Sequence, residues 1–197
     1  MQVDPPAWAV TTDASPFGVG AVLSAVDKDM DQLRPTVAFR GKVTRNVAES
    51  IGVAFREASG QAVLEAWTVL LAVRYWRGTL KGGRLLLKSD STVALALAKK
   101  LASSTPTLNW VGAELAMVMD VLQMQDIVAH HLPGKLNTEA DWLSRPDMQG
   151  PAPGMLKDIN IRQLNEAWML ETSLPSPGTQ PSLWGRSPTV SAVFDHL

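Results

Sequence analysis

The chain has 197 residues, 46% of them hydrophobic, and its 18 Lys and Arg residues nearly balance its 19 Asp and Glu residues. This length and composition exclude a disordered chain and suffice for one domain with an appendage or for two small domains. The absence of cysteine excludes a disulfide framework and cysteine-ligated zinc or iron–sulfur sites, and three histidines leave little for a histidine-based site. Any metal site must therefore be built from oxygen ligands.

The apolar stretches are too short to span a bilayer. The stretch at 62–73, for example, is interrupted by Glu65, and a span needs about 20 apolar residues. The N-terminus lacks the basic-then-apolar pattern of a signal peptide. We therefore expect an intracellular protein, in the cytoplasm or the nucleus, with no membrane partner.

The first predicted elements form an antiparallel meander. Residues 8–13 and 19–26 favour strands, and the turn sequence Ser15-Pro16-Phe17-Gly18 separates them. Residues 35–40 could form a third strand.

From residue 58 the spacing of the apolar residues changes from that of a strand to that of a helix. Leu64, Trp67, Leu71 and Tyr75 recur at helical spacing, which predicts a helix over 58–80 that ends at glycines. The next predicted elements are a strand over 84–90, helices over 91–101 and 107–123, a strand over 127–131, and a short helix over 137–144. The order predicts an α/β fold with a mixed five-stranded sheet, an antiparallel meander followed by parallel strands, flanked by helices on both faces.

The prolines cluster late in the chain. Seven of the 13 lie from Pro146 onward, so we expect a compact domain over 1–146 and a Pro-rich extension over 147–197. Within this extension, the apolar residues of 155–171 recur at helical spacing and predict one short amphipathic helix.

Four acidic residues occupy positions that a pure core would not tolerate. Asp13 and Asp90 each close an apolar strand, Glu65 lies within an apolar helix, and Asp141 lies in the last helix. A carboxylate at the end of a buried strand is costly unless it is paired or bound to metal, and Mg²⁺ is the ion that suits an all-carboxylate cluster. For any single aspartate, a solvated strand end is the alternative reading; the four together favour a magnesium site.

The motifs around these acids resemble the ribonuclease H domain of reverse transcriptases from LTR retroelements, pararetroviruses and tyrosine-recombinase retroelements. The opening TDASPFGVGAVL at 12–23 is similar to that family's first strand and hairpin, and Ala38-Phe39-Arg40 to its third strand. Glu65 followed by LAVRYWR at 71–77 resembles its catalytic helix, and SDST at 89–92 its third acidic motif. HLPGK at 131–135 and ADWLSR at 140–145 resemble its ending. The resemblance covers about 140 of the 197 residues.

This resemblance implies a ribonuclease-H-like fold and hydrolysis of the RNA strand of RNA–DNA hybrids with two Mg²⁺ ions, for which Mn²⁺ can substitute. Carried over from the family pattern, Asp13 bridges the ions, Asp141 helps to hold one, and Glu65 and Asp90 help to hold the other. His131, ten residues before Asp141, takes the family's role in proton transfer or product release. A strand-end histidine before a Pro-Gly turn is the structural alternative. A fused or associated reverse transcriptase polymerase domain is the implied partner.

Substrate binding needs basic residues. Twelve of the 18 Lys and Arg residues lie between Arg34 and Lys100, against four acids, which suggests a surface facing a polyanion; an ordinary solvated face is the alternative. Some bacterial-type relatives bind substrate with a basic helical protrusion that this chain lacks. We therefore expect contacts from the 34–56 segment, with Arg40 and Lys42 as candidates. Ser15 and Ser91 could donate to phosphates, or they could cap a turn and a helix.

Other readings of the acids are weaker. A retroviral-type integrase needs a glutamate about 35 residues after its second aspartate, and a proofreading exonuclease needs Asp-x-Glu in its first strand; the chain has neither. The serious alternative is a non-catalytic ribonuclease-H-like module that serves as a connection or a nucleic-acid-binding platform. Such modules typically lose acids, whereas all four are present here.

Overall fold

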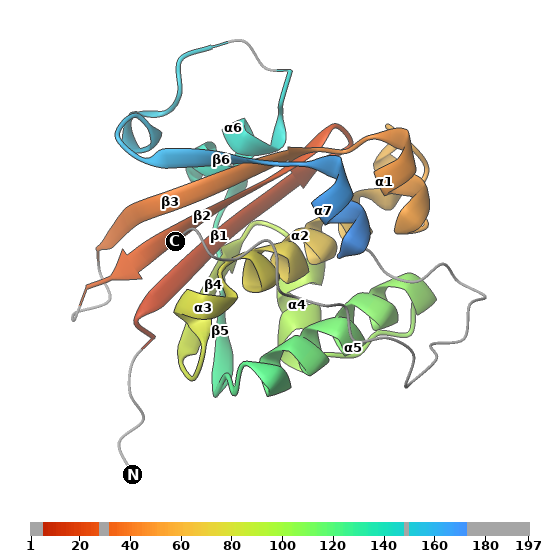
Figure 1. The fold of residues 1–197 in the computed structure, drawn as a ribbon, viewed down its shortest axis with the longest axis horizontal. Helices are drawn as coiled ribbons and strands as arrows, with labels where there is room; N and C mark the ends of the chain where they lie inside the picture. Colours follow the sequence, from red (N-terminus) through yellow and green to blue (C-terminus); the bar gives the residue numbers. More distant parts are fainter. Residues whose placement is uncertain (1–5, 28–31, 148–149, 173–197) are drawn as a thin grey trace.

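The computed structural model describes residues 6–27, 32–147 and 150–172. They form a mixed sheet with the strand order β5-β4-β1-β2-β3-β6 and helices on both faces (Figure 1). The expected fold class, an α/β fold in which an antiparallel meander precedes parallel strands, is confirmed. The sheet has six strands rather than the expected five, because a late segment adds one at the edge. None of the described helices has both the length and the apolar character needed to cross a membrane.

The meander consists of β1 (Trp8–Ser15), β2 (Gly18–Val26) and β3 (Leu33–Lys42), which pair antiparallel. The Ser15 hydroxyl closes the first hairpin, because it accepts hydrogen bonds from the backbone N–H groups of Phe17 and Gly18, both at 3.2 Å. The turn expected at 15–18 is thus built on a side chain.

The second half of the sheet is parallel. β4 (Arg84–Ser89) pairs with β1, and β5 (Asp126–His131) pairs with β4. The helices that connect these strands are α2 (Gln61–Tyr75), α3 (Arg77–Leu80), α4 (Thr92–Lys100) and α5 (Pro106–Val121). Parallel neighbours require such crossovers, so the helices cover one face of the sheet.

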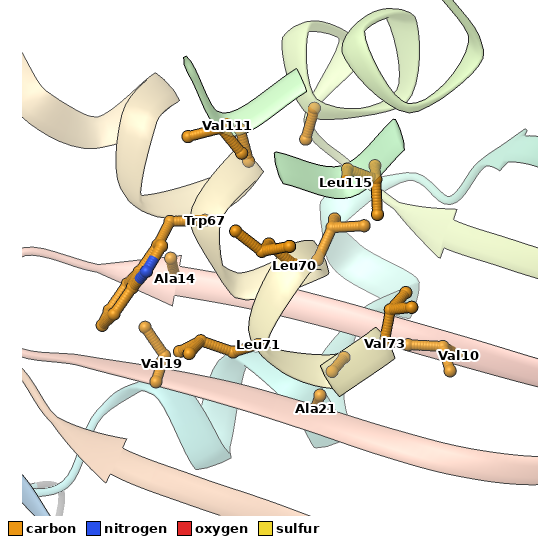
Figure 2. Close-up of a cluster of buried hydrophobic side chains, with 14 of the residues drawn as sticks. Val10, Ala14, Val19, Ala21, Trp67, Leu70, Leu71, Val73, Val111 and Leu115 are labelled. Atoms are coloured by element: carbon orange, nitrogen blue, oxygen red, sulfur yellow. The ribbon is translucent and has the colours of Figure 1, made fainter. Parts of the chain in front are cut away.

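The main core lies between that face and α2. Figure 2 shows α2 between the sheet and α5, and its labelled residues are Val10, Ala14, Val19, Ala21, Trp67, Leu70, Leu71, Val73, Val111 and Leu115. Because α2 contacts the sheet on one side and α4 and α5 on the other, it is apolar almost all round. Burial on both sides fixes the helix that carries Glu65.

The opposite face is covered by α6 (Thr138–Ser144). This helix lies unusually close to β2, since a Cβ atom on Gly20 would be 2.5 Å from the Cβ of Leu143 and 2.7 Å from the backbone N of Ser144. Gly20 pairs with Asp13 across the hairpin. A glycine at this position therefore allows α6 to approach the aspartate.

Residues 150–172 complete the sheet in a way that the sequence did not indicate. The interval 155–171 contains a 3-10 turn (Gly154–Leu156), β6 (Asn160–Leu164) and α7 (Glu166–Glu171) in place of one helix. The single-helix prediction is therefore wrong, because β6 pairs with the free edge of β3 and Asn165 caps a new helix start at Trp168 N–H. The sheet thus extends beyond the boundary expected at residue 146. The remainder of the expected extension, 173–197, lies outside the described residues.

A second unpredicted helix supports α7. The short helix α1 (Arg45–Ser50) follows β3, and the Glu166 carboxylate accepts hydrogen bonds from Thr44 (2.7 Å) and Asn46 (3.1 Å). On the other side, the rings of Trp168 and Tyr75 meet edge to face at 5.6 Å. α7 is therefore fixed between α1 and the end of α2.

We expect Gly20→Ala to destabilise the protein by about 3 kcal/mol, because the new methyl group overlaps backbone as well as side-chain atoms of α6. The control is Gly78→Ala in α3, where no atom lies within 4 Å of the added Cβ. The control should be neutral or slightly stabilising. Urea unfolding of both variants measures the difference, and equal midpoints would show that α6 does not approach β2 as described.

Met169→Ala should cost about 2–4 kcal/mol, because Met169 in α7 is only 1% exposed and packs into the main core. Met155 is 51% exposed, so Met155→Ala should change stability by less than about 0.5 kcal/mol. A loss no larger for Met169→Ala than for Met155→Ala in the same unfolding assay would mean that α7 is not integrated into the domain.

Candidate active site

The two strand-end aspartates come together as the sequence predicts. The parallel pairing of β1 with β4 sets Thr11 opposite Lys88. Asp13 and Asp90 each lie two residues further along, Asp13 near the end of β1 and Asp90 directly after β4. The two carboxylates therefore project from the same end of neighbouring strands.

Glu65 joins them from the first turns of α2. The side chain of Gln61, the first residue of α2, donates from Nε2 to the carbonyl oxygen of Ala14 at 2.5 Å and to Glu65 Oε1 at 3.1 Å. One amide thus attaches the start of the helix to β1, beside Asp13, and also orients the Glu65 carboxylate.

Asp141 arrives on α6, which is attached to β1 at both ends. Before the helix, Asn137 Nδ2 donates to the carbonyl oxygen of Thr12 at 3.2 Å. In its last turn, Ser144 Oγ donates to Asp13 Oδ2 at 2.5 Å and also lies 2.9 Å from the Asp141 carbonyl oxygen. These contacts place the helix that carries Asp141 against β1 at Asp13.

The electrostatics of Asp13 show that the other three acids act on it. Asp13 is 9% exposed, and its pKa is raised from 3.8 to about 7, chiefly by burial and to a smaller extent by the negative charges of Asp90, Asp141 and Glu65. The hydrogen bond from Ser144 lowers the pKa but does not offset these effects. Burial and three nearby negative charges disfavour the ionised form of this aspartate, whereas a bound cation would favour it.

The carboxylates do not yet form a metal-binding set. In the part of the chain that the structure describes, no three histidine or acidic side chains are arranged to hold a metal ion. Three of the four acids are instead bound by neighbouring donors: Asp13 by Ser144, Glu65 by Gln61, and Asp141 by Arg145, whose Nε and Nη2 lie 2.9 and 2.6 Å from Asp141 Oδ1.

This donor set nevertheless fits Mg²⁺. Carboxylate oxygens are the ligands that Mg²⁺ prefers, and a divalent cation would offset the burial and the repulsion that together raise the pKa of Asp13. Arg145 is half-exposed and pairs with Asp141 over one helical turn, so its release requires only a side-chain rotation. Metal binding is thus compatible with this backbone.

His131 is the last residue of β5, opposite Ser89 and exposed. The loop that follows it lies against Asp90, since a Cβ atom on Gly134 would be 3.0 Å from Asp90 Oδ2. The backbone of His131 therefore lies opposite the residue before Asp90, and the role of its imidazole in proton transfer or product release stays a prediction.

The two serines expected to contact phosphates have other roles. Ser15 donates its one hydroxyl proton to the carbonyl oxygen of Ser144 at 2.7 Å while closing the hairpin turn, and a phosphate contact from this residue stays a prediction. Ser91 is 7% exposed and caps α4, accepting a hydrogen bond from Ala94 N–H at 3.1 Å. Its capping role, the alternative named from the sequence, is the one seen.

The two basic candidates are also engaged within the protein. The Arg40 guanidinium lies over the Trp142 ring, 5.0 Å from the ring centre, and donates to the carbonyl oxygen of Arg145 at 3.3 Å. Lys42 lies 3.5 Å from Asp147, in an exposed ion pair that is easily broken. Lys42 can therefore reach a phosphate, whereas Arg40 serves first to hold α6.

Several residues that orient the acids had no role assigned from the sequence. Ser144 and Arg145 belong to the motif at 140–145 that closes the resemblance, and Asn137 lies just before it, which indicated that they matter without indicating their contacts. Gln61 had no such signal, because its function depends on the approach of α2 to the carbonyl of Ala14.

The raised pKa of Asp13 predicts that stability without metal falls as pH rises. Folded Asp13 keeps its proton up to about pH 7, whereas the unfolded chain releases it near pH 3.8, so the folded state binds more protons in this window. The free energy of unfolding should therefore decrease between pH 4 and 7, by as much as about 4 kcal/mol from this group.

Asp13→Asn should remove this decrease, and Glu139→Gln, a change of the same kind on α6, should keep it. Urea unfolding at several pH values in EDTA gives the comparison. Parallel pH profiles for the wild type and Asp13→Asn would contradict the crowded environment of Asp13.

No protein-family model matches the chain. Among solved structures, RNase H1 from the halophilic archaeon Halobacterium salinarum NRC-1 is similar with 15% identity and a TM-score of 0.47, over 69% of this chain and 92% of that one. LC11-RNase H1, isolated from compost by a metagenomic approach, is similar with 16% identity and a TM-score of 0.49, over 71% of this chain and 93% of that one. The foamy viral protease-reverse transcriptase in complex with RNA/DNA hybrid is similar with 12% identity and a TM-score of 0.47, over 74% of this chain and 20% of that chain. At these identities the similarity is one of fold.

Proposed function

We propose that this protein is a ribonuclease H, a metal-dependent endoribonuclease that hydrolyses the RNA strand of RNA–DNA hybrids, and that it works with the polymerase domain of a retroelement reverse transcriptase. The observation that carries the proposal is the proximity of Glu65, Asp90 and Asp141 to Asp13, whose burial, together with these three negative charges, raises its pKa to about 7. The order of the motifs along the chain supports the same reading and is the basis for the retroelement context.

The residues have distinct parts in this proposal. Asp13 and Asp141 would hold one Mg²⁺ ion, and Asp13, Glu65 and Asp90 the other. When bound, two such ions would lower the pKa of the attacking water and stabilise negative charge on the leaving 3′ oxygen.

The rest of the site orients these ligands. Ser144 fixes one oxygen of Asp13 and leaves the other free, while Gln61 holds Glu65 against β1. Arg145 neutralises Asp141 until a stronger cation takes its place. His131 ends β5, directly before the loop that contacts Asp90. From this position an imidazole could carry a proton to or from the reacting groups.

The test is incubation of the purified full chain with labelled RNA–DNA hybrid in Mg²⁺, Mn²⁺ or EDTA. We expect cleavage of the RNA strand with either metal and none in EDTA. Asp13→Asn, Glu65→Gln, Asp90→Asn and Asp141→Asn should each reduce the rate by about a thousandfold or more, because several kcal/mol of transition-state stabilisation depend on each ligand. Glu139→Gln, two residues from Asp141, should cleave like the wild type.

A second readout separates metal binding from cleavage. Mg²⁺ should raise the unfolding temperature of the wild type, because it binds only the folded state, and should not raise that of Asp13→Asn. A wild type that binds hybrid without cutting it in any metal would favour the alternative function, a non-catalytic nucleic-acid-binding module.

A further inference from the structure

A compact group of two arginines and two phenylalanines lies outside the carboxylate site. The Arg56 guanidinium carbon lies 5.0 Å from the ring centre of Phe55 and 5.7 Å from that of Phe17, and the Arg45 guanidinium lies 5.1 Å from Phe55. Phe17 is 45% exposed, and both arginines are exposed. We call these four residues the arginine–phenylalanine surface.

The positive charges of this surface are not used within the described part of the protein. Neither Arg45 nor Arg56 forms an ion pair there, in contrast to Lys42, Arg74, Arg84 and Arg145. Glu57, the acid that follows Arg56 in the chain, instead accepts a hydrogen bond from Ser59. Two unpaired guanidinium groups are therefore held against aromatic rings at the surface.

The backbone of Arg56 is strained in this arrangement. Arg56 has a φ of 63°, a conformation that a non-glycine residue adopts at the expense of strain. Its side chain gains contact with both rings in return. A guanidinium stacked on a ring loses little conformational freedom on binding, and its N–H groups at the edge remain free to grip an anion with two parallel hydrogen bonds.

The surface adjoins the proposed catalytic residues. Phe17 lies in the hairpin turn four residues after Asp13, and its carbonyl oxygen accepts a hydrogen bond from Val43 N–H at 2.9 Å, just before α1. Figure 1 shows α1 beside the end of the sheet where β1 turns into β2. Arg56 lies on the connection that leads into α2 and Glu65. A strand lying across the acids would thus continue toward this surface.

We propose that the arginine–phenylalanine surface binds the backbone of the nucleic acid next to the cleaved position, with Arg45 and Arg56 on phosphates and Phe17 against a sugar or an unpaired base. This inference rests on the proposed function. It replaces the sequence-based candidate Arg40, whose guanidinium is occupied by Trp142 and Arg145. This surface suits phosphates better than it suits a protein partner. Its guanidinium groups can each donate two parallel hydrogen bonds beside an exposed ring, and neither is paired with an acid in the described part of the chain.

The test measures binding of the full chain to a labelled RNA–DNA hybrid in Ca²⁺ at several salt concentrations. Arg45→Gln/Arg56→Gln removes two charges but keeps long polar side chains, so it should lower the slope of log K against log salt by about 1.8, at about 0.9 per phosphate. Phe17→Leu should weaken binding by about tenfold with an unchanged slope, since it removes only a stacking face. The matched control, Lys81→Gln/Lys157→Gln, removes two exposed charges at positions away from the acids and should retain the wild-type slope.

The outcomes separate this inference from the proposed function. If the wild type cleaves hybrid but the arginine double variant binds with the wild-type slope, the inference is overturned and the enzyme assignment stands. If the wild type binds hybrid without cleaving it and the double variant loses slope, the inference stands and the enzyme assignment fails. A wild type that binds no nucleic acid overturns both. An equal loss of slope in the lysine control would overturn the inference about the arginine–phenylalanine surface, because the effect would then be one of net charge.

Discussion

The burial of Asp13 among three other acids is the constraint on which the rest of the site depends. A carboxylate that is 9% exposed and carries a pKa near 7 costs the fold about 4 kcal/mol when it ionises. The protein limits this cost with one short hydrogen bond from Ser144 and relieves Asp141 with Arg145. Both donors come from the last turn of α6 or directly after it, so the docking of that helix decides the electrostatics of the whole site.

The docking of α6 in turn depends on the sheet beneath it. Gly20 allows the helix to approach β2, and Asn137 attaches its start to the residue before Asp13. On the other face, burial of α2 between sheet and helices holds Glu65, with Gln61 as its link to β1. The site is thus assembled from both faces of one sheet. Its four acids come from two strand ends and two helices, and three of them are held by hydrogen bonds from neighbouring Ser, Gln and Arg side chains.

The sequence was most informative where local pattern and structure coincide. The three meander strands, β4, β5 and the helices between them follow from period and turn residues, and the meeting of Asp13 with Asp90 follows from parallel pairing. β6 could not be predicted, because pairing with β3 depends on which edge is free in the assembled sheet. For the same reason the partners of Ser15, Arg40 and Arg56 could not be read from sequence. Each side chain had several possible partners, and tertiary approach selected among them.

Titration of the Asp13 carboxyl carbon by NMR tests the central claim most directly. Without metal, the account predicts an apparent pKa near 7, because burial and three neighbouring negative charges act together. With saturating Mg²⁺, the same carboxylate should remain ionised to well below that pH, since a bound cation favours the charged form. A pKa near 3.8 in the absence of metal, or one near 7 that Mg²⁺ leaves unchanged, would contradict the proposal that these four acids form a metal-dependent site.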